Sequence, residues 1–224
     1  METFFSWQWL TAFGSILLLD LILSGDNAVL IALACKKLPK QHHLKAMIIG
    51  CSGAIIIRIL LTVFATELLA VPYIQFIGGF ALFYIAIKLL DNGHDEENTA
   101  APATLLGAVK TIIIADFIMS IDNVLSMAGL ANTIPNERWS LIICGLLISL
   151  PIVICGAQIF LLIMQKFPSL IYLGSAILAF TAAKMILMDK ALGHYLIYFN
   201  GWLEAIFMIS IFLWGLYKNK QTAH

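Results

Sequence analysis

The sequence predicts an all-α protein that crosses a membrane several times. Of its 224 residues, 61% are hydrophobic and only 12% are charged, whereas soluble domains average about 25% charged residues. A helix needs about 20 apolar residues to cross the hydrocarbon core, twice the roughly 9–11 residues of an outer-membrane barrel strand. Seven segments reach helical length, at Leu10–Leu33, Leu44–Leu69, Val71–Leu90, Leu105–Ala131, Trp139–Met164, Pro168–Met188 and Tyr195–Tyr217.

The first and fourth of these segments share a polar motif of two aspartates, a serine and an asparagine. A charged residue in the bilayer core costs about 2.5–3.5 kcal/mol on insertion scales, so buried charges indicate a functional site. Capping or hydrogen bonding between helices would explain one such aspartate more readily than four at duplicated positions. The two copies, 96 positions apart, consist of Asp20, Ser24, Asp26 and Asn27, and of Asp116, Ser120, Asp122 and Asn123.

The duplication extends beyond the motif, because identities recur at the same offset without a gap. Each repeat contains three predicted spans, an odd number, so the second repeat must enter the membrane from the opposite side, as in many secondary transporters. We therefore expect two inverted three-helix repeats and one extra helix. The paired identities are Ala32 and Ala128, Pro39 and Pro135, Phe64 and Phe160, Pro72 and Pro168, Gly78 and Gly174, and Lys88 and Lys184.

The same repeat gives the expected domain organisation. The first repeat covers residues 1–90 and an acidic cytoplasmic linker covers 91–104. The inverted second repeat covers 105–190, and the seventh helix with a short cytoplasmic tail covers 191–224. Cytoplasmic loops are enriched in lysine and arginine, and the first loop is the most basic, with Lys36, Lys37, Lys40 and Lys45. We therefore expect the N-terminus outside and the C-terminus in the cytoplasm.

Helical geometry separates the residues of the first motif. Asp20, Ser24 and Asn27 share one face, whereas Asp26 points about 120° away on a regular helix. A helix break at Gly25 would turn Asp26 toward the other three residues. Close helix packing is the alternative explanation for this glycine. The second motif has Ile121 at the corresponding position, where a break is less expected.

The chemistry of the motifs indicates a cation site. Carboxylate, carboxamide and hydroxyl oxygens suit Mg²⁺, Ca²⁺ and Mn²⁺, and no histidine or cysteine accompanies them. Four ionised aspartates around one divalent ion leave uncompensated negative charge, which predicts coupling to protons. Arg58, which corresponds to Ile154 in the second repeat, is either a counter-ion to an aspartate or part of a structural pair. Glu67 and Glu204 are further candidates for carrying protons.

The motif segments LDLILSGDN (Leu19–Asn27) and ADFIMSIDN (Ala115–Asn123) resemble the two signature motifs of the TerC family of integral membrane proteins, in its compact bacterial form. The family belongs with the lysine-exporter superfamily. The resemblance implies a bacterial inner-membrane protein that exports Mn²⁺. The metal ligands it implies are Asp20, Asp26, Asn27, Asp116, Asp122 and Asn123, with Ser24 and Ser120 as helpers.

Three functions therefore remain open. A divalent-metal exporter that works by alternating access accounts for the duplication, the symmetry and the ligand types together. An exporter of a small organic solute, such as an amino acid, would need apolar room in the site. An intramembrane aspartyl protease would need two aspartates that share a proton, but it gives no reason for the duplicated serines and asparagines. We expect no enzymatic activity, no bound cofactor and no nucleic-acid partner.

Overall fold

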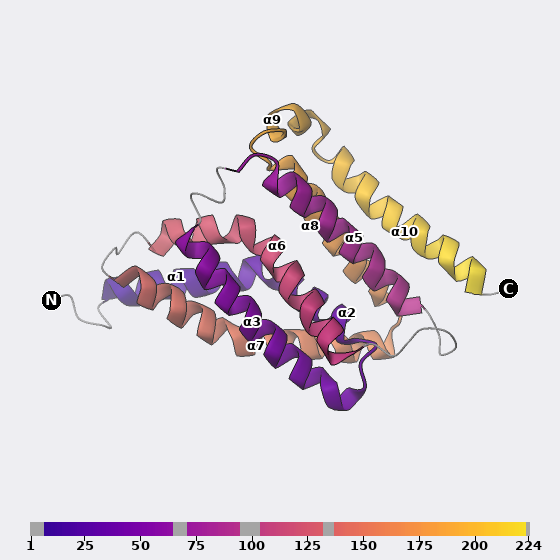
Figure 1. Ribbon diagram of the computed structural model, residues 1–224, viewed down its shortest axis with the longest axis horizontal. Coiled ribbons are helices and arrows are strands. Elements are labelled where there is room, and N and C mark those ends of the chain that lie inside the picture. Colours follow the sequence, from indigo (N-terminus) through magenta and orange to yellow (C-terminus); the bar gives the residue numbers. More distant parts are fainter. Residues whose placement is uncertain (1–6, 65–70, 95–103, 132–136, 223–224) are drawn as a thin grey trace.

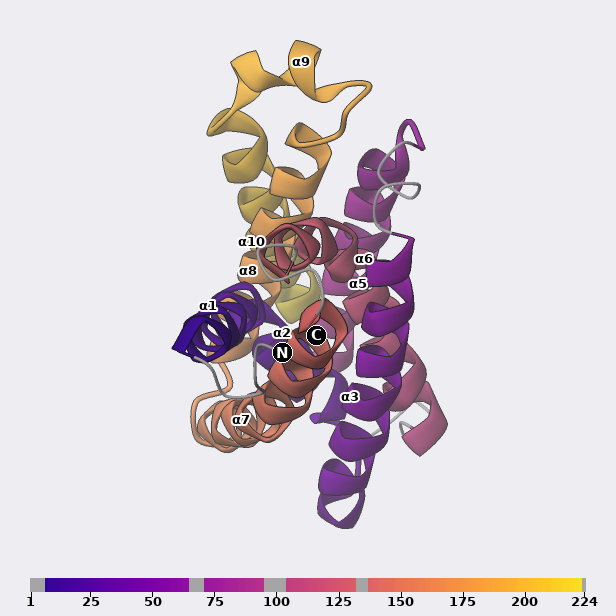
Figure 2. The ribbon, with the colours of Figure 1, turned by 90° about the vertical axis from the view of Figure 1, so that its left-hand side faces the viewer.

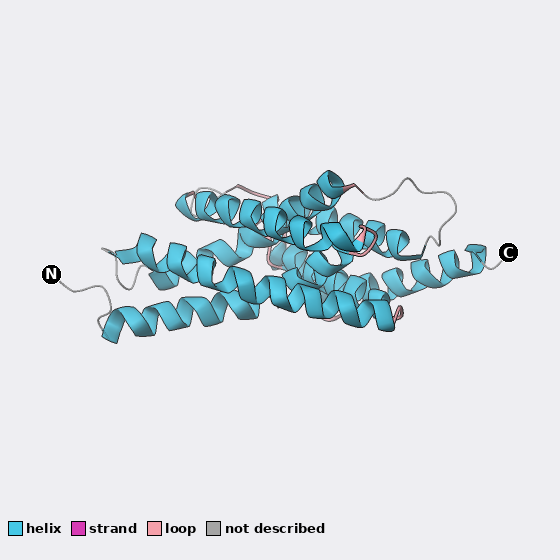
Figure 3. Ribbon diagram, turned by 90° about the horizontal axis from the view of Figure 1, so that it is seen from below, coloured by secondary structure: helices cyan, strands magenta, loops and turns pink. Residues whose placement is uncertain are grey.

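The computed structural model describes residues 7–64, 71–94, 104–131 and 137–222, and every regular element in these ranges is helical (Figures 1 and 3). Short turns connect most of them, so the described chain is a bundle of helices. The α-helices are α1 (Trp7–Leu23), α2 (Gly25–Cys35), α3 (Lys40–Val63), α5 (Ile74–His94), α6 (Leu105–Ala131), α7 (Arg138–Lys166), α8 (Leu170–Leu187), α9 (Gly193–Leu196) and α10 (Trp202–Thr222), and a 3₁₀ turn, η2, covers Ile197–Phe199.

Within the described residues, four helices are long and apolar enough to cross a membrane: α3, α5, α7 and α8. The bent pair of α1 and α2 makes a fifth if it counts as one span. Large apolar side chains also cover the outside of the bundle, as at Leu18, Ile77 and Leu162. These observations identify a multi-pass membrane protein and support four or five of the seven predicted spans.

The two halves of the chain pack into each other. Helix α3 of the first half packs against α6 of the second, α1 and α2 pack against α7, and α5 packs against α8. Glycines allow these close approaches, since a Cβ at Gly50 would lie 2.9 Å from the Ile112 side chain and one at Gly79 would lie 2.7 Å from the Ala182 carbonyl oxygen. Small residues serve this purpose at many membrane helix interfaces. The last helix, α10, lies against α8 and α5 at one side of the bundle (Figure 2).

The directions of the helices alternate between the halves. In Figure 1, α6 runs opposite to α1, α7 runs opposite to α3, and α8 runs opposite to α5. Each of these pairs consists of helices at corresponding places in the two sequence repeats. The C-terminal end of α5 and the N-terminal end of α8 consequently lie toward the same side of the molecule.

The chain bends where the first motif predicted a helix break. Helices α1 and α2 meet at an angle of 48°, and Ser24 between them has φ −103° and ψ 8°. A Cβ at Gly25 would meet nothing within 4 Å, so close packing does not account for this glycine. In the second repeat, α6 continues through the corresponding position. The bend therefore belongs to the first repeat alone.

Candidate functional site

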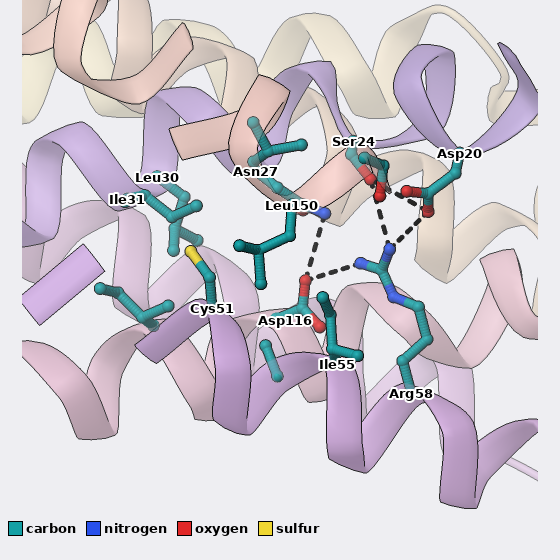
Figure 4. Close-up of a pocket in the computed structure, with 14 residues that line it drawn as sticks. Asp20, Ser24, Asn27, Leu30, Ile31, Cys51, Ile55, Arg58, Asp116 and Leu150 are labelled. Carbon is teal, nitrogen blue, oxygen red and sulfur yellow. Dashed lines mark hydrogen bonds and ion pairs between the residues drawn. The ribbon is translucent and has the colours of Figure 1, made fainter. Parts of the chain in front are cut away.

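The centre of the candidate site is an arginine between two aspartates (Figure 4). Arg58 comes from α3, and its Nη1 lies 2.6 Å from Oδ1 of Asp20 on α1. Its Nη2 lies 2.7 Å from Oδ1 of Asp116 on α6. All three residues are buried, with 4%, 1% and 8% of their surfaces exposed, respectively. The structure thus brings together the first aspartate of each motif and shows Arg58 as the counter-ion to both.

The serines of the two motifs complete this arrangement. The Nε of Arg58 donates a hydrogen bond to Ser120 Oγ at 3.0 Å, and Nη1 donates one to Ser24 Oγ at 3.4 Å. Ser120 in turn donates to Asp116 Oδ2 at 3.1 Å, and Ser24 donates to Asp20 Oδ1 at 3.4 Å. The serine lies four residues after the aspartate in each motif, which places both side chains on one helix face. One guanidinium therefore binds the aspartate–serine pair of each repeat.

Asn27 links the first motif to the second. Its Nδ2 donates a hydrogen bond to Asp116 Oδ1 at 3.2 Å, so this oxygen accepts from both Asn27 and Arg58. Asn27 Oδ1 and Asp20 Oδ2 are buried and have no hydrogen-bond partner among the described residues. Buried polar atoms are nearly always paired in native proteins. Two unpaired oxygens at one centre therefore indicate room for a ligand that accepts electron pairs, such as a cation.

These side chains border a small cavity of about 30 Å³, enough for about one water molecule or one ion. Arg58, Asp20, Ser24, Asn27 and Asp116 form its polar part. The rest of the lining is mainly aliphatic, so the polar groups are held away from water and their mutual interactions are strong. The other lining residues are Leu30, Ile31, Cys51, Ala54, Ile55, Ile112, Ser149, Leu150 and Val153.

Asp26, the second aspartate of the first motif, lies apart from this centre. Its Oδ2 accepts a hydrogen bond from Thr181 Oγ1 on α8 at 3.0 Å, and its Oδ1 is buried without a described partner. Asp26 and Thr181 line a groove between α1, α2, α6 and α8, with about 1140 Å³ of empty space, together with Asn123 and Lys184. Asn123 Nδ2 lies 3.5 Å from the Leu23 carbonyl oxygen, near the bend. The seven motif residues whose side chains are described therefore do not form one cluster.

The structure leaves part of the predicted ligand set undescribed. The side chain of Asp122 is outside the described set, as is all of Glu67. Among the side chains that are described, no group of three or more histidine, cysteine, aspartate or glutamate residues is arranged to hold a metal ion. Oxygens of Asp20 and Asp116 contact the guanidinium of Arg58, at the place where the sequence predicts a metal ion. The metal ligands therefore stay a prediction.

Sequence reasoning missed Thr181, because a single threonine in an apolar helix carries no signal and its counterpart in the first repeat is Ile85. It also missed Asp189, a buried residue that accepts hydrogen bonds from the backbone of Phe76, Ala191 and Leu192. Glu204 accepts a hydrogen bond from the Gly201 backbone at the start of α10. These two carboxylates lie away from the centre and stabilise chain turns.

Comparison with known proteins agrees with this picture. The model of the integral membrane protein TerC family matches residues 5–222. The uncharacterized membrane protein YjbE of Bacillus subtilis (strain 168) is 39% identical over 178 residues, which cover 80% of each chain. The inner membrane protein YgdQ of Escherichia coli (strain K12) is 25% identical over 234 residues, covering 96% of this chain and 94% of YgdQ. No solved structure matches. The chain therefore belongs to the TerC family of integral membrane proteins.

Proposed function

We propose that the protein transports a divalent metal cation, Mn²⁺, out of the cell by alternating access across the inner membrane. The observation that carries the proposal is the buried centre between the repeats. There, Asp20 and Asp116 share one monovalent cation, the Arg58 guanidinium, and oxygens of Asp20 and Asn27 are unpaired. A buried site with two carboxylates and further oxygen ligands is suited to binding a cation.

The donor atoms favour a hard or borderline ion. Carboxylate oxygens of Asp20 and Asp116, the amide oxygen of Asn27 and the hydroxyls of Ser24 and Ser120 are ligands that Mn²⁺, Mg²⁺ and Ca²⁺ accept. The family resemblance favours Mn²⁺ among these ions. We propose Asp26, Asp122 and Asn123 as further ligands along the path of the ion. An aspartyl protease is disfavoured, because Asp20 and Asp116 contact an arginine rather than each other.

Two grooves beside the centre support alternating access. One is the groove that contains Asp26, and the other lies between α5 and α6, with about 700 Å³ of empty space. Six residues of the second groove correspond to six of the first at the repeat offset of 96 positions. These pairs are Ala81 and Ile177, Tyr84 and Phe180, Ile85 and Thr181, Lys88 and Lys184, Leu89 and Met185, and Ile118 and Ile22.

The two grooves lie toward opposite ends of the molecule. Of the groove residues, Tyr84–Leu89 lie in the C-terminal half of α5, and Phe180–Met185 lie in the C-terminal half of α8. Because α5 and α8 run in opposite directions (Figure 1), these halves approach opposite sides of the membrane. This arrangement supports inverted repeats, with one groove toward each side. With the N-terminus outside, the Asp26 groove faces outward.

The aliphatic lining of the cavity favours one other candidate, a small organic cation or amino acid. Leu30, Ile31, Ile55, Leu150 and Val153 give the cavity an apolar lining, but its volume of about 30 Å³ would have to increase to hold such a solute. The same transport assay separates the two functions, because a metal exporter needs no organic solute and an organic-solute exporter needs no metal.

The first prediction is that the purified protein in liposomes moves Mn²⁺ and that the two central aspartates are essential. Asp20→Asn and Asp116→Asn each remove a charged ligand and are expected to reduce Mn²⁺ flux by more than about tenfold. Asp91→Asn is the matched control, because Asp91 contacts Trp214 and Lys218 at the end of α5, away from the centre. The assay uses a panel of divalent ions and amino acids.

Flux at the wild-type level in both central variants, at equal reconstitution, would reject the site. Movement of another divalent ion with the same dependence on Asp20 and Asp116 would change only the substrate. Movement of amino acids without any divalent ion would favour the organic-solute exporter.

A further inference from the structure

We propose that Arg58 is a tethered counter-ion that takes the place of the transported cation in the empty protein. It leaves Asp20 and Asp116 when a divalent ion binds and returns when the ion departs. The inference rests on the proposed transport of a divalent cation, and it assigns to Arg58 a step in that transport. Arg58 is then a positioning residue whose movement links ion release to the return of the empty site.

The guanidinium and a metal ion compete for the same atoms. Asp20 Oδ1 and Asp116 Oδ1, the two oxygens that face each other across the centre, each receive a nitrogen of Arg58 at 2.6 and 2.7 Å. Divalent ions coordinate carboxylate oxygens at about 2.0–2.6 Å. A metal bound between these oxygens would therefore occupy the position of the guanidinium. Two positive groups cannot share this position in a buried, largely aliphatic cavity, because their repulsion is poorly screened there.

The position of Arg58 favours exchange with a metal ion over a purely structural role in which Arg58 links two helices. The residue contacts the aspartate and serine of both motifs, so it neutralises the centre between the two repeats rather than one side of it. Its counterpart in the second repeat is Ile154, so the described centre holds one arginine and not two. A single guanidinium is sufficient for one ion site and leaves space for an ion when it withdraws.

The empty protein needs such a group. A carrier that releases its ion must reorient without it, and two ionised carboxylates in a buried centre are strongly unfavourable without a partner. Arg58 supplies that partner from within the chain. In the bound state the metal supplies it instead. We therefore expect that Arg58 is required when the empty protein reorients across the membrane, but not when the protein reorients with its ion bound.

The test compares net efflux with exchange. Liposomes containing Arg58→Met are loaded with Mn²⁺ and diluted into Mn-free buffer to measure net efflux. The same liposomes are diluted into radiolabelled Mn²⁺ to measure exchange, which never requires the empty protein to reorient. We expect net efflux below about a tenth of the wild-type rate and near-normal exchange. Arg138→Met is the matched control, because Arg138 is exposed and stacks on Trp139.

Binding of Mn²⁺ provides a second readout that a structural role would not produce. If Arg58 occupies the carboxylates about nine-tenths of the time, its removal tightens apparent binding by about tenfold. Calorimetry on detergent-purified protein measures this change for Arg58→Met. Arg58→Lys keeps the charge but loses the planar fork that spans two carboxylates, so it is expected to show intermediate binding and partial net efflux.

Several outcomes would overturn the proposal. Loss of both net efflux and exchange in folded Arg58→Met, with unchanged Mn²⁺ affinity, would make Arg58 a structural tie. Normal net efflux in Arg58→Met would show that the empty protein reorients without Arg58. If Arg58→Met does not fold, wild-type affinity and efflux in Arg58→Lys would refute the competition. Failure of the wild-type protein to move any divalent ion would instead reject the proposed function.

Discussion

At the scale of single residues, the contact between Thr181 and Asp26 links α8 to the start of α2, inside the groove that both residues line. The Thr181 hydroxyl donates to Asp26 Oδ2 at 3.0 Å and to the Ile177 carbonyl oxygen at 3.1 Å. The other Asp26 oxygen has no partner among the residues described. A cation passing through the groove would therefore meet a carboxylate that is held in place by one hydroxyl.

We predict that Thr181→Val slows Mn²⁺ flux by about two- to tenfold, since one hydrogen bond contributes about 0.5–1.5 kcal/mol. Valine keeps the shape of threonine but cannot donate to Asp26. Thr181→Ser keeps the hydroxyl and serves as the control. Mn²⁺ affinity at the Arg58 centre should stay unchanged in both variants, because Thr181 does not line that cavity. Equal flux in the valine and serine variants would show that the contact is dispensable.

The residues of the site differ in how far the sequence could identify them. Charges in apolar segments are conspicuous, so the sequence identifies Asp20 and Asp116 as candidate site residues, and in the structure both contact Arg58. The sequence left the partner of Arg58 open, since pairing across helices depends on packing between segments far apart in the chain. Thr181 could not be found at all, because its role arises only from the position of α8 next to the bend.

At the scale of elements, the bend between α1 and α2 does not turn Asp26 toward Asp20 and Asn27, so that part of the prediction was wrong. A continuous helix would also separate these residues, but Asp26 now lies at the first turn of α2, beside α8. Apolar length predicted most of the described helices to within a few residues, but the segment Tyr195–Tyr217 is divided into α9, η2 and α10, which begins only at Trp202. Glycine predicted the location of the break. The angle of the bend depends on tertiary contacts and could not be predicted.

We predict that Gly25→Ala impairs transport by favouring a straight helix. Alanine favours helix by about 0.5–1 kcal/mol over glycine, and the added Cβ would meet no atom within 4 Å. Any effect would therefore come from backbone stiffness and not from a clash. Gly14→Ala is a closely matched control, because Gly14 is equally open but lies within the regular α1.

Mn²⁺ flux in liposomes and thermal unfolding of the purified protein measure the two effects separately. Gly25→Ala should lower flux without lowering the unfolding temperature, while Gly14→Ala should leave flux unchanged. Equal flux in the two variants would mean that the bend needs no glycine.

At the scale of the whole molecule, the chain combines two similar halves with an asymmetric centre. The helix directions and the paired grooves follow the repeat, whereas Arg58, Gly25 and Thr181 have Ile154, Ile121 and Ile85 as counterparts. Sequence identity at a fixed offset predicts two related halves. The repeat could not predict what Arg58 and Thr181 do, because each of these polar residues without a polar counterpart contacts an aspartate of the other half.

The last prediction is that Mn²⁺ export is coupled to protons. The centre contains two carboxylates, from Asp20 and Asp116, and one guanidinium, so one negative charge remains after the metal leaves even when Arg58 is in place. Asp26 and the predicted ligand Asp122 add further carboxylates along the path. Protons are the simplest way to neutralise them during the return of the empty protein, since ionised groups in an apolar environment are costly.

In liposomes with membrane voltage clamped, Mn²⁺ efflux should therefore drive protons inward, and an imposed pH gradient should change the rate of efflux. A uniporter with a hydrated, charged empty site predicts neither effect. Arg58→Met sharpens the distinction, because without the guanidinium two charges remain at the centre and any residual net efflux should depend more strongly on the pH gradient. Net efflux that ignores the gradient in the wild-type protein would reject proton coupling.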